Sequence, residues 1–140
     1  MSPIVNPLEA LADAIMAFEG WSAGSRSNRH RNPGNLRPVL PSQAQADGYR
    51  VFPSLIMGYG ALLKDLEIKF DGQSRTGIGP QSTLGELMAV WAPASDGNAP
   101  GQYARFVAKW LAVALDRPIT PETTLAEINP SRDRDGGPHA

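Results

Sequence analysis

The chain has 140 residues, a net charge of −1 and 19% charged residues, a balance that gives no global reason to expect nucleic acid or an anionic membrane as its partner. Its length suits one domain with a sizeable core. The lack of cysteine excludes disulfide bonds and thiolate metal sites. No run approaches the ~20 apolar residues of a membrane span, and no secretory signal follows Met1, so we expect neither.

The first predicted element is a helix that Asn6 caps, with Pro7 in its first turn. Gly20 is expected to end it. The apolar side chains on one face of this helix have helical spacing: Leu8, Leu11, Ile15 and Phe18. Glu19 lies four residues after Ile15, so its side chain projects close to the same face. Burying an unpaired carboxylate costs several kcal/mol, which makes Glu19 the residue that needs an explanation.

A polar segment rich in arginine comes next, and residues 22–34 are predicted to be loop. Pro33 and Gly34 occupy the central positions of a predicted type II turn, Asn32 to Asn35. Short strands are expected at 36–37 and 49–52. They flank a polar loop at 41–48, so that the three pieces form a small hairpin.

Three longer helices and one short helix are predicted after the hairpin. Ser54 caps the first of these helices, and Asp71-Gly72 ends it. Thr83 and Glu86 form a capping box for the second. Pro100 begins the third, which runs to about Leu115, and Thr120-Pro121 begins the short helix. The expected buried positions are Leu55, Tyr59, Leu62, Leu63, Leu66, Phe70, Leu87, Met88, Val90, Trp91, Tyr103, Phe106, Val107, Trp110, Leu111, Ala114, Leu125 and Ile128. The prediction is a single α+β, mainly α-helical domain over residues 1–128, followed by a disordered tail over 129–140.

Several segments in this order resemble one family. They are Phe-Glu-Gly at 18–20, Arg-Asn-Pro-Gly-Asn-Leu-Arg at 31–37, Tyr-Arg-Val-Phe-Pro-Ser at 49–54, Trp-Ala-Pro at 91–93 and Tyr-Ala at 103–104. The combination is similar to the lysozyme-like peptidoglycan-degrading domains of bacteriophages and bacteria, which are related in fold to goose-type lysozymes and lytic transglycosylases. The resemblance covers about residues 8 to 128.

This resemblance implies a lysozyme-like fold and cleavage of the β-1,4 bonds of peptidoglycan between N-acetylmuramic acid and N-acetylglucosamine. Glu19 matches the glutamate that serves as catalytic acid, and Tyr103 matches a tyrosine that reaches toward it. Asn35 lies where relatives place polar substrate contacts. Many transglycosylases have Gly-Leu-Met-Gln where this chain has Asn-Pro-Gly-Asn-Leu-Arg, so the reaction subtype and the second polar group stay open.

The residues themselves leave alternatives for each of these roles. Glycoside cleavage needs a protonated carboxylic acid, and desolvation beside Phe18 and Trp21 would favour that form of Glu19. The alternative is a structural ion pair between Glu19 and an arginine of the loop: Arg26, Arg29 or Arg31. Asp47 is the one acid in the hairpin region and a candidate second carboxylate, although Asp-Gly is more often a simple turn.

The candidate substrate-binding residues are Asn32, Asn35, Arg37, Tyr49 and Trp21. The asparagines suit N-acetyl groups, the arginines suit an anionic wall polymer, and the aromatic rings suit stacking on sugars. Turn formation is the commoner reason for such asparagines, and solvation and packing explain the arginines and the aromatic residues equally well. His30 is expected to be a solvated loop residue, because no metal-ligand spacing accompanies it.

The sequence therefore predicts an enzyme that cleaves peptidoglycan with one glutamate as acid and base and needs no metal or cofactor. Its partner is the glycan strand, without nucleic acid or stable membrane insertion, and the protein is a monomer or part of a phage assembly. The alternative is a non-catalytic glycan-binding or phage structural domain with the same fold. The absent signal fits either holin-dependent release from the host cytoplasm or a place in the virion.

Overall fold

The computed structural model describes residues 5–20, 25–38, 42–46, 48–92 and 99–130. Within them the chain is mainly helical with a small two-stranded antiparallel sheet, which confirms the predicted α+β, mainly α class. The elements are α1 (Pro7–Phe18), α2 (Arg26–Arg29), β1 (Gln45–Ala46), β2 (Tyr49–Arg50), α3 (Leu55–Phe70), α4 (Leu84–Trp91), α5 (Pro100–Leu115) and α6 (Leu125–Ile128). None of these described helices is both long enough and apolar enough to cross a membrane.

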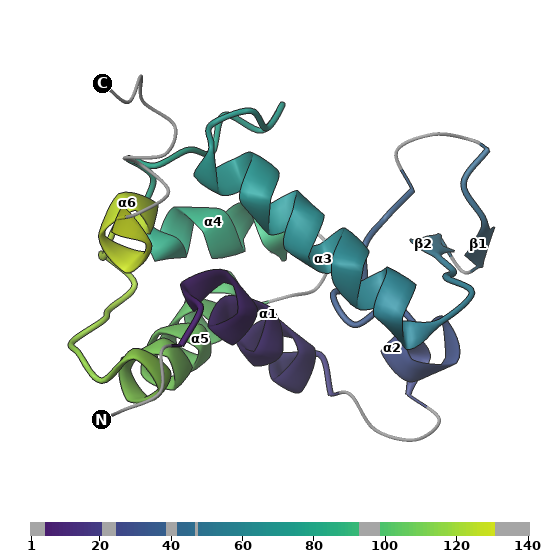
Figure 1. The fold of residues 1–140 in the computed structure, drawn as a ribbon, viewed down its shortest axis with the longest axis horizontal. Coiled ribbons are helices and arrows are strands. Elements are labelled where there is room, and N and C mark those ends of the chain that lie inside the picture. The colour runs from purple at the N-terminus through teal and green to yellow at the C-terminus, as the bar shows by residue number, and fades with distance from the viewer. Residues whose placement is uncertain (1–4, 21–24, 39–41, 47, 93–98, 131–140) are drawn as a thin grey trace.

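The helices pack around one apolar core. α1 packs against α5 and α3, and α4 packs against α5. Figure 1 shows α3 running obliquely across the molecule, with α2 and the hairpin near its first turn and α6 at the opposite end. The core is built from side chains of all the longer helices and of α6; its fully buried members include Leu11, Ile15, Leu62, Leu66, Leu84, Leu87, Met88, Leu111, Leu125 and Ile128.

The helix starts follow the predicted caps. Asn6 Oδ1 accepts hydrogen bonds from the backbone N–H groups of Leu8 and Glu9, at 2.9 and 3.2 Å, and Ser54 Oγ accepts from Met57 N–H at 3.3 Å. The predicted capping box at the start of α4 is present. Each cap satisfies backbone donors that the first helical turn leaves without an intrahelical partner.

Two predictions about helix ends are wrong in detail. The short helix α6 begins after Thr124, whose side chain forms a capping box with Glu127, rather than at Thr120-Pro121. At its other end Asn129 is buried, and its backbone N–H donates to the Leu125 carbonyl at 2.9 Å. The fold therefore includes Asn129, which the prediction assigned to the tail; residues 131–140 of that tail lie outside the described residues.

Three predicted core side chains are exposed. Phe106 and Trp110 on α5 are 37% and 39% exposed, and Leu55 at the start of α3 is 40% exposed. Their helical stripe is broader than the surface that neighbouring helices cover, so its margin faces solvent. His30 shows the reverse error: it is buried although it was predicted to be solvated.

The hairpin is shifted from its predicted position, and the preceding loop contains the short helix α2. Gln45 pairs with Arg50 and Ala46 with Tyr49, so the first strand lies inside the predicted 41–48 loop rather than at 36–37. The reason is that the Asn32 side chain engages both backbone groups of Leu36, accepting from its N–H at 2.8 Å and donating to its carbonyl at 2.9 Å. The Leu36 carbonyl still accepts from Arg50 N–H at 2.9 Å.

The turn over residues 32–35 is present, but it is not of type II. Asn35 N–H donates to the Asn32 carbonyl at 3.0 Å, and the left-handed residue is Asn35, with φ of 50°. A type II turn requires positive φ at Gly34 instead. Gly34 is needed for another reason: a Cβ there would lie 2.8 Å from a Leu62 methyl carbon and 3.2 Å from the Trp91 ring.

Candidate functional site

Glu19 stands at the C-terminal end of α1, half-buried, and both of its carboxylate oxygens are held. Oε1 accepts a hydrogen bond from Asn35 Nδ2 at 2.6 Å, and Oε2 accepts one from the Tyr103 hydroxyl at 2.8 Å. These donors come from the 32–35 turn and from the first turn of α5. Three segments that are distant in sequence therefore meet at one carboxylate.

The alternative explanation of Glu19, a structural ion pair with an arginine, receives no support from the described side chains. Neither Arg29 nor Arg31 pairs with Glu19; Arg31 instead donates from Nε to the Phe52 carbonyl at 2.9 Å. The side chain of Arg26 lies outside the part of the chain that is described. Glu19 is thus oriented by two neutral donors.

Tyr103 is a buried donor. It is 1% exposed, and the Phe18 ring stacks on it with centroids 3.9 Å apart. Burial raises the pKa of the Tyr103 hydroxyl far above its usual value, and the neighbouring Glu19 carboxylate raises it further. The group therefore keeps its proton and donates to Glu19 over the whole physiological pH range. Because no surface of Tyr103 is free to meet a ligand, it acts through Glu19.

The side-chain amide of Asn35 has an acceptor oxygen that accepts no hydrogen bond from the described residues. Its backbone adopts the left-handed conformation that asparagine tolerates better than most residues, and this points its amide at Glu19. While Nδ2 is used, Oδ1 is buried and has no hydrogen-bond partner among the described residues. A buried acceptor without a partner is costly, so this oxygen beside Glu19 is suited to a donor from outside the chain.

Asn32, a predicted substrate-binding residue, has no such capacity, because its side chain is buried and its amide is used within the chain. It is 0% exposed. Its Nδ2 donates to the carbonyls of Leu36 and Arg50, both at 2.9 Å, and its Oδ1 accepts from Leu36 N–H. The side chain joins the turn to β2 and shapes the loop that carries Asn35.

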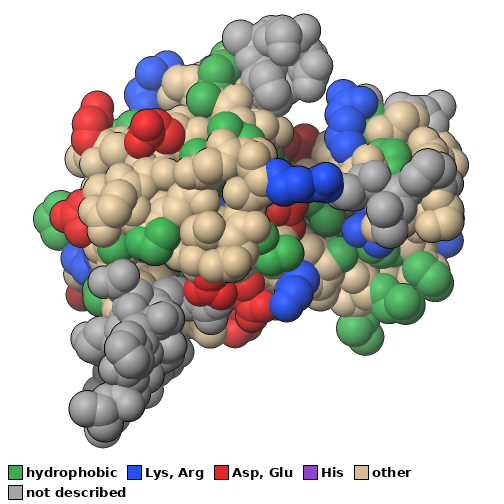
Figure 2. Space-filling model, turned by 90° about the horizontal axis from the view of Figure 1, so that it is seen from above, with side chains coloured by type: hydrophobic (Ala, Val, Ile, Leu, Met, Phe, Trp, Pro, Cys, Tyr) green, Lys and Arg blue, Asp and Glu red, His purple; other side chains and the backbone are tan. Residues whose placement is uncertain are grey.

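A groove runs from Asn35 toward the hairpin. A cavity of about 190 Å³ is lined by Asn35, Trp91 and Val90 together with residues that it shares with a larger cavity of about 580 Å³. The shared residues are Leu36, Arg37, Asp65, Lys69 and Thr76. Figure 2 shows a face of the molecule that is hollowed, with Lys and Arg side chains gathered around the hollow.

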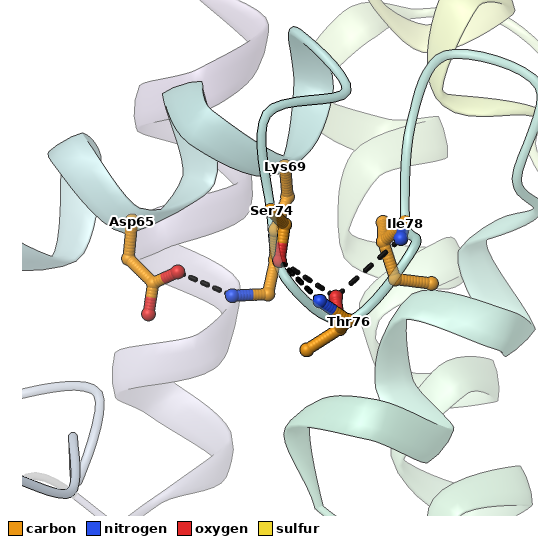
Figure 3. Close-up of polar contacts among 5 residues, drawn as sticks. All are labelled: Asp65, Lys69, Ser74, Thr76 and Ile78. Atoms are coloured by element: carbon orange, nitrogen blue, oxygen red, sulfur yellow. Dashed lines mark hydrogen bonds and ion pairs between the residues drawn. The ribbon is translucent and has the colours of Figure 1, made fainter. Parts of the chain in front are cut away.

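The wall that the two cavities share contains an ion pair that sequence reasoning missed. Asp65 and Lys69, one turn apart on α3, form a salt bridge, and Ser74 and Thr76 face it from the loop after α3 (Figure 3). Lys69 Nζ also lies 5.3 Å from the centre of the Trp91 ring. The available signal was a Lys–Asp pair at i, i+4 spacing beside the buried Leu62–Leu66 stripe.

The remaining predicted site residues fall into two groups. Arg37 is exposed and lines both cavities. Its guanidinium lies 4.5 Å from the centre of the Tyr49 ring and donates to the Tyr49 hydroxyl at 3.3 Å, so this face of Tyr49 supports Arg37 and is closed to a sugar. Trp21 and Asp47 lie outside the described residues.

The described side chains form no cluster of three or more histidine or carboxylate groups that would hold a metal ion. Comparisons of the chain with known protein families, with curated proteins and with solved structures found no match.

Proposed function

We propose that this chain cleaves the β-1,4 glycosidic bonds of peptidoglycan, with Glu19 as the general acid and base and with a lysozyme-like fold. The observation that carries the proposal is the carboxylate of Glu19, which Asn35 and Tyr103 hold, together with the smaller cavity that Asn35 lines. A carboxylate with a purely structural role would not need a neighbour that lines a cavity. A carboxylate that transfers a proton to a bound glycan needs both a fixed orientation and such a neighbour. The choice of peptidoglycan as the substrate comes from the resemblance in sequence.

The chemistry assigned to Glu19 is proton transfer. A protonated Glu19 keeps lone pairs that accept from Tyr103 and Asn35, and its own O–H remains for the glycosidic oxygen. The proton passes to that oxygen while the bond from the sugar's C1 to the oxygen breaks, and the leaving sugar departs as an alcohol. The resulting carboxylate then serves as the base.

The second step does not require a second protein carboxylate. The acetamido oxygen of the sugar can attack C1, after which water releases a reducing end. Alternatively the C6 hydroxyl attacks C1 and gives its proton to Glu19, which leaves an anhydro sugar. Mass spectrometry of the released muropeptides distinguishes the two products, because the anhydro product lacks the added water.

Asn35 contributes a second contact. Its Oδ1, buried and without a partner among the described groups, accepts the N–H of an N-acetyl group in the smaller cavity. Tyr103 is a positioning residue, since it is shielded from the groove and touches only Glu19 among the reacting groups.

The test of the proposal is Glu19→Gln, with Glu9→Gln as its matched control. Glu9 lies on the same helix and is exposed at the opposite end. Glu19→Gln is expected to keep the circular-dichroism spectrum and to lower the clearing rate of a bacterial wall suspension by about 10²–10⁴-fold, the usual effect of losing a general acid. Glu9→Gln is expected to clear walls at the wild-type rate. Full clearing by Glu19→Gln would end the proposal.

One observation favours a second candidate, a glycan-binding domain without turnover. Among the described residues that line the two cavities, Asp65 is the only acid, and Lys69 pairs with it. A binding domain needs no free carboxylate in its groove. This candidate predicts that the protein cosediments with walls without clearing them and that Glu19→Gln changes neither result.

A further inference from the structure

The larger cavity has an uneven charge. Five cationic side chains line it: Arg37, Arg50, Lys64, Lys69 and Arg75. Asp65 is the one acid among the described residues of its lining. Because Lys69 pairs with Asp65, the acid does not offset the other four cations. The cavity is therefore cationic in a chain whose overall charge is −1.

Two of these cations make no ion pair with the described side chains. Lys64 on α3 and Arg75 on the loop after α3 have no carboxylate partner among the described residues. Arg50 lies over the Phe52 ring at 4.5 Å, and Arg37 lies over Tyr49, so aromatic faces support both guanidinium groups from below. Cations that converge on a cavity from four segments, where the one described acid is already paired, form a site suited to an anion.

The position of this cationic cavity identifies which part of a substrate it meets. The small cavity beside Asn35 has room for about one sugar ring, and it continues into the cationic cavity through shared residues. An anionic group in the larger cavity is therefore carried by the same glycan strand. In peptidoglycan such groups are the carboxylates of the peptide stems, which are linked to the strand through the lactyl group of muramic acid.

We propose that the cationic cavity binds the carboxylates of a peptide stem and so selects stem-bearing strands over neutral chitin-type strands. The proposal rests on the proposed function, because it takes the neighbouring small cavity as the site of the sugar. Lys64 and Arg75 are its specificity-determining residues. They contact the stem, at a distance from the bond that is cleaved, and therefore change substrate binding more than the chemical step.

The test compares two double variants that remove equal charge from the chain. Lys64→Gln/Arg75→Gln removes two cations of the cationic cavity, and Arg105→Gln/Lys109→Gln removes two cations of α5 that line neither cavity. The substrates are purified stem-bearing strands, the same strands with their carboxylates converted to neutral amides, and strands from which an amidase has removed the stems.

The cavity variant is expected to raise KM for stem-bearing strands about tenfold at low salt, with kcat within twofold of wild type. The control variant is expected to leave KM unchanged. On amidated and on stem-free strands the cavity variant and the wild type should behave alike. A tenfold effect that persists on stem-free strands would assign the anion to the lactyl carboxylate and overturn the stem proposal. Equal effects of both double variants, or no effect of either, would also overturn it.

Failure of the proposed function gives a different result. If the wild type releases no muropeptide from any strand, cosedimentation with the same three strands replaces kinetics. Charge-dependent binding that the cavity variant weakens would then support the stem site in a protein that does not cleave. Equal binding to the three kinds of strand would overturn the stem proposal.

Discussion

The helices and the segment of residues 30–52 are held together by different forces. The helices meet through fully buried apolar side chains such as Leu11, Leu62 and Leu111, each of which contributes about 1.5–3 kcal/mol by leaving water. The described part of the 30–52 segment contains one short sheet, and its shape depends on hydrogen bonds from Asn32 and Arg31 to the backbone. Apolar contact is non-directional, whereas a hydrogen bond requires defined angles.

This difference shows which interactions fix the positions of the three site residues. Glu19 and Tyr103 are carried by helices that apolar burial stabilises, but Asn35 is placed by the polar network of the 30–52 segment. The stability of the molecule and the geometry of its site therefore depend on different residues. Substitutions can separate the two.

The largest effect is expected from Asn32→Ala. It removes the partner of Leu36 N–H and of the Arg50 carbonyl, and one of the two donors to the Leu36 carbonyl, at a buried side chain, which should cost about 3–5 kcal/mol of unfolding free energy. The exposed Gln45→Ala is the control and should change stability by less than ~0.5 kcal/mol. Urea unfolding measures both values.

Hydrogen exchange then tests the comparison itself. In the Asn32→Ala protein, amides of the 30–52 segment should lose protection while those of α1 and α5 keep it. If the helical amides lose protection to the same extent, the two regions form one cooperative unit and the contrast between them is wrong.

A smaller effect is expected at the seam between the two regions, from Gly58→Ala. A Cβ at Gly58 would lie 1.9 Å from the carbonyl oxygen of Arg31, so the backbone of the 30–52 segment must move away from α3. We expect a loss of about 2–3 kcal/mol. Gly60→Ala, on the same helix but with no atom within 4 Å of its Cβ, should instead stabilise by about 0.5–1 kcal/mol. Thermal unfolding of both variants measures these changes. If both variants change the free energy of unfolding in the same direction, the close contact at Gly58 is contradicted.

The smallest effect on stability, with a selective effect on activity, is expected from Tyr103→Phe. The variant keeps the ring stacked on Phe18 and loses one hydrogen bond to Glu19, at a cost of about 1 kcal/mol. Because Tyr103 positions Glu19, kcat should fall about tenfold while KM stays within twofold.

Tyr59→Phe is the matched control, since the Tyr59 hydroxyl also donates to a carboxylate, that of Asp13, at 2.9 Å. It should leave both kinetic constants unchanged. A fall in kcat of the same size in both variants would show that lost stability, rather than the position of Glu19, explains the result.

Pattern and caps predicted most of the helical part of the fold. The starts at Asn6, Ser54 and Thr83 depend on side chains that bond to backbone groups within the next three residues, and such local interactions are visible in sequence. The predictions of burial are wrong where a contact with a segment distant in sequence determines whether a side chain is covered. The burial of His30 and the exposure of Phe106 and Trp110 depend on which surface another segment covers, and helical spacing does not contain that information.

The candidate site divides in the same way. The sequence by itself determined that Glu19 ends an apolar helix, because spacing along one helix is local, and the resemblance in sequence proposed its chemistry. Only the tertiary structure decided that Asn35 and Tyr103 hold this carboxylate, that Asn32 is a buried brace, and that Asp65 pairs with Lys69 in the wall of the groove. The bonds to Glu19, and the bond from Asn32 to Arg50, join distant segments, so they exist only after the apolar core has brought those segments together; the Asp65–Lys69 pair is local to α3, and only its place in the wall of the groove depends on the fold.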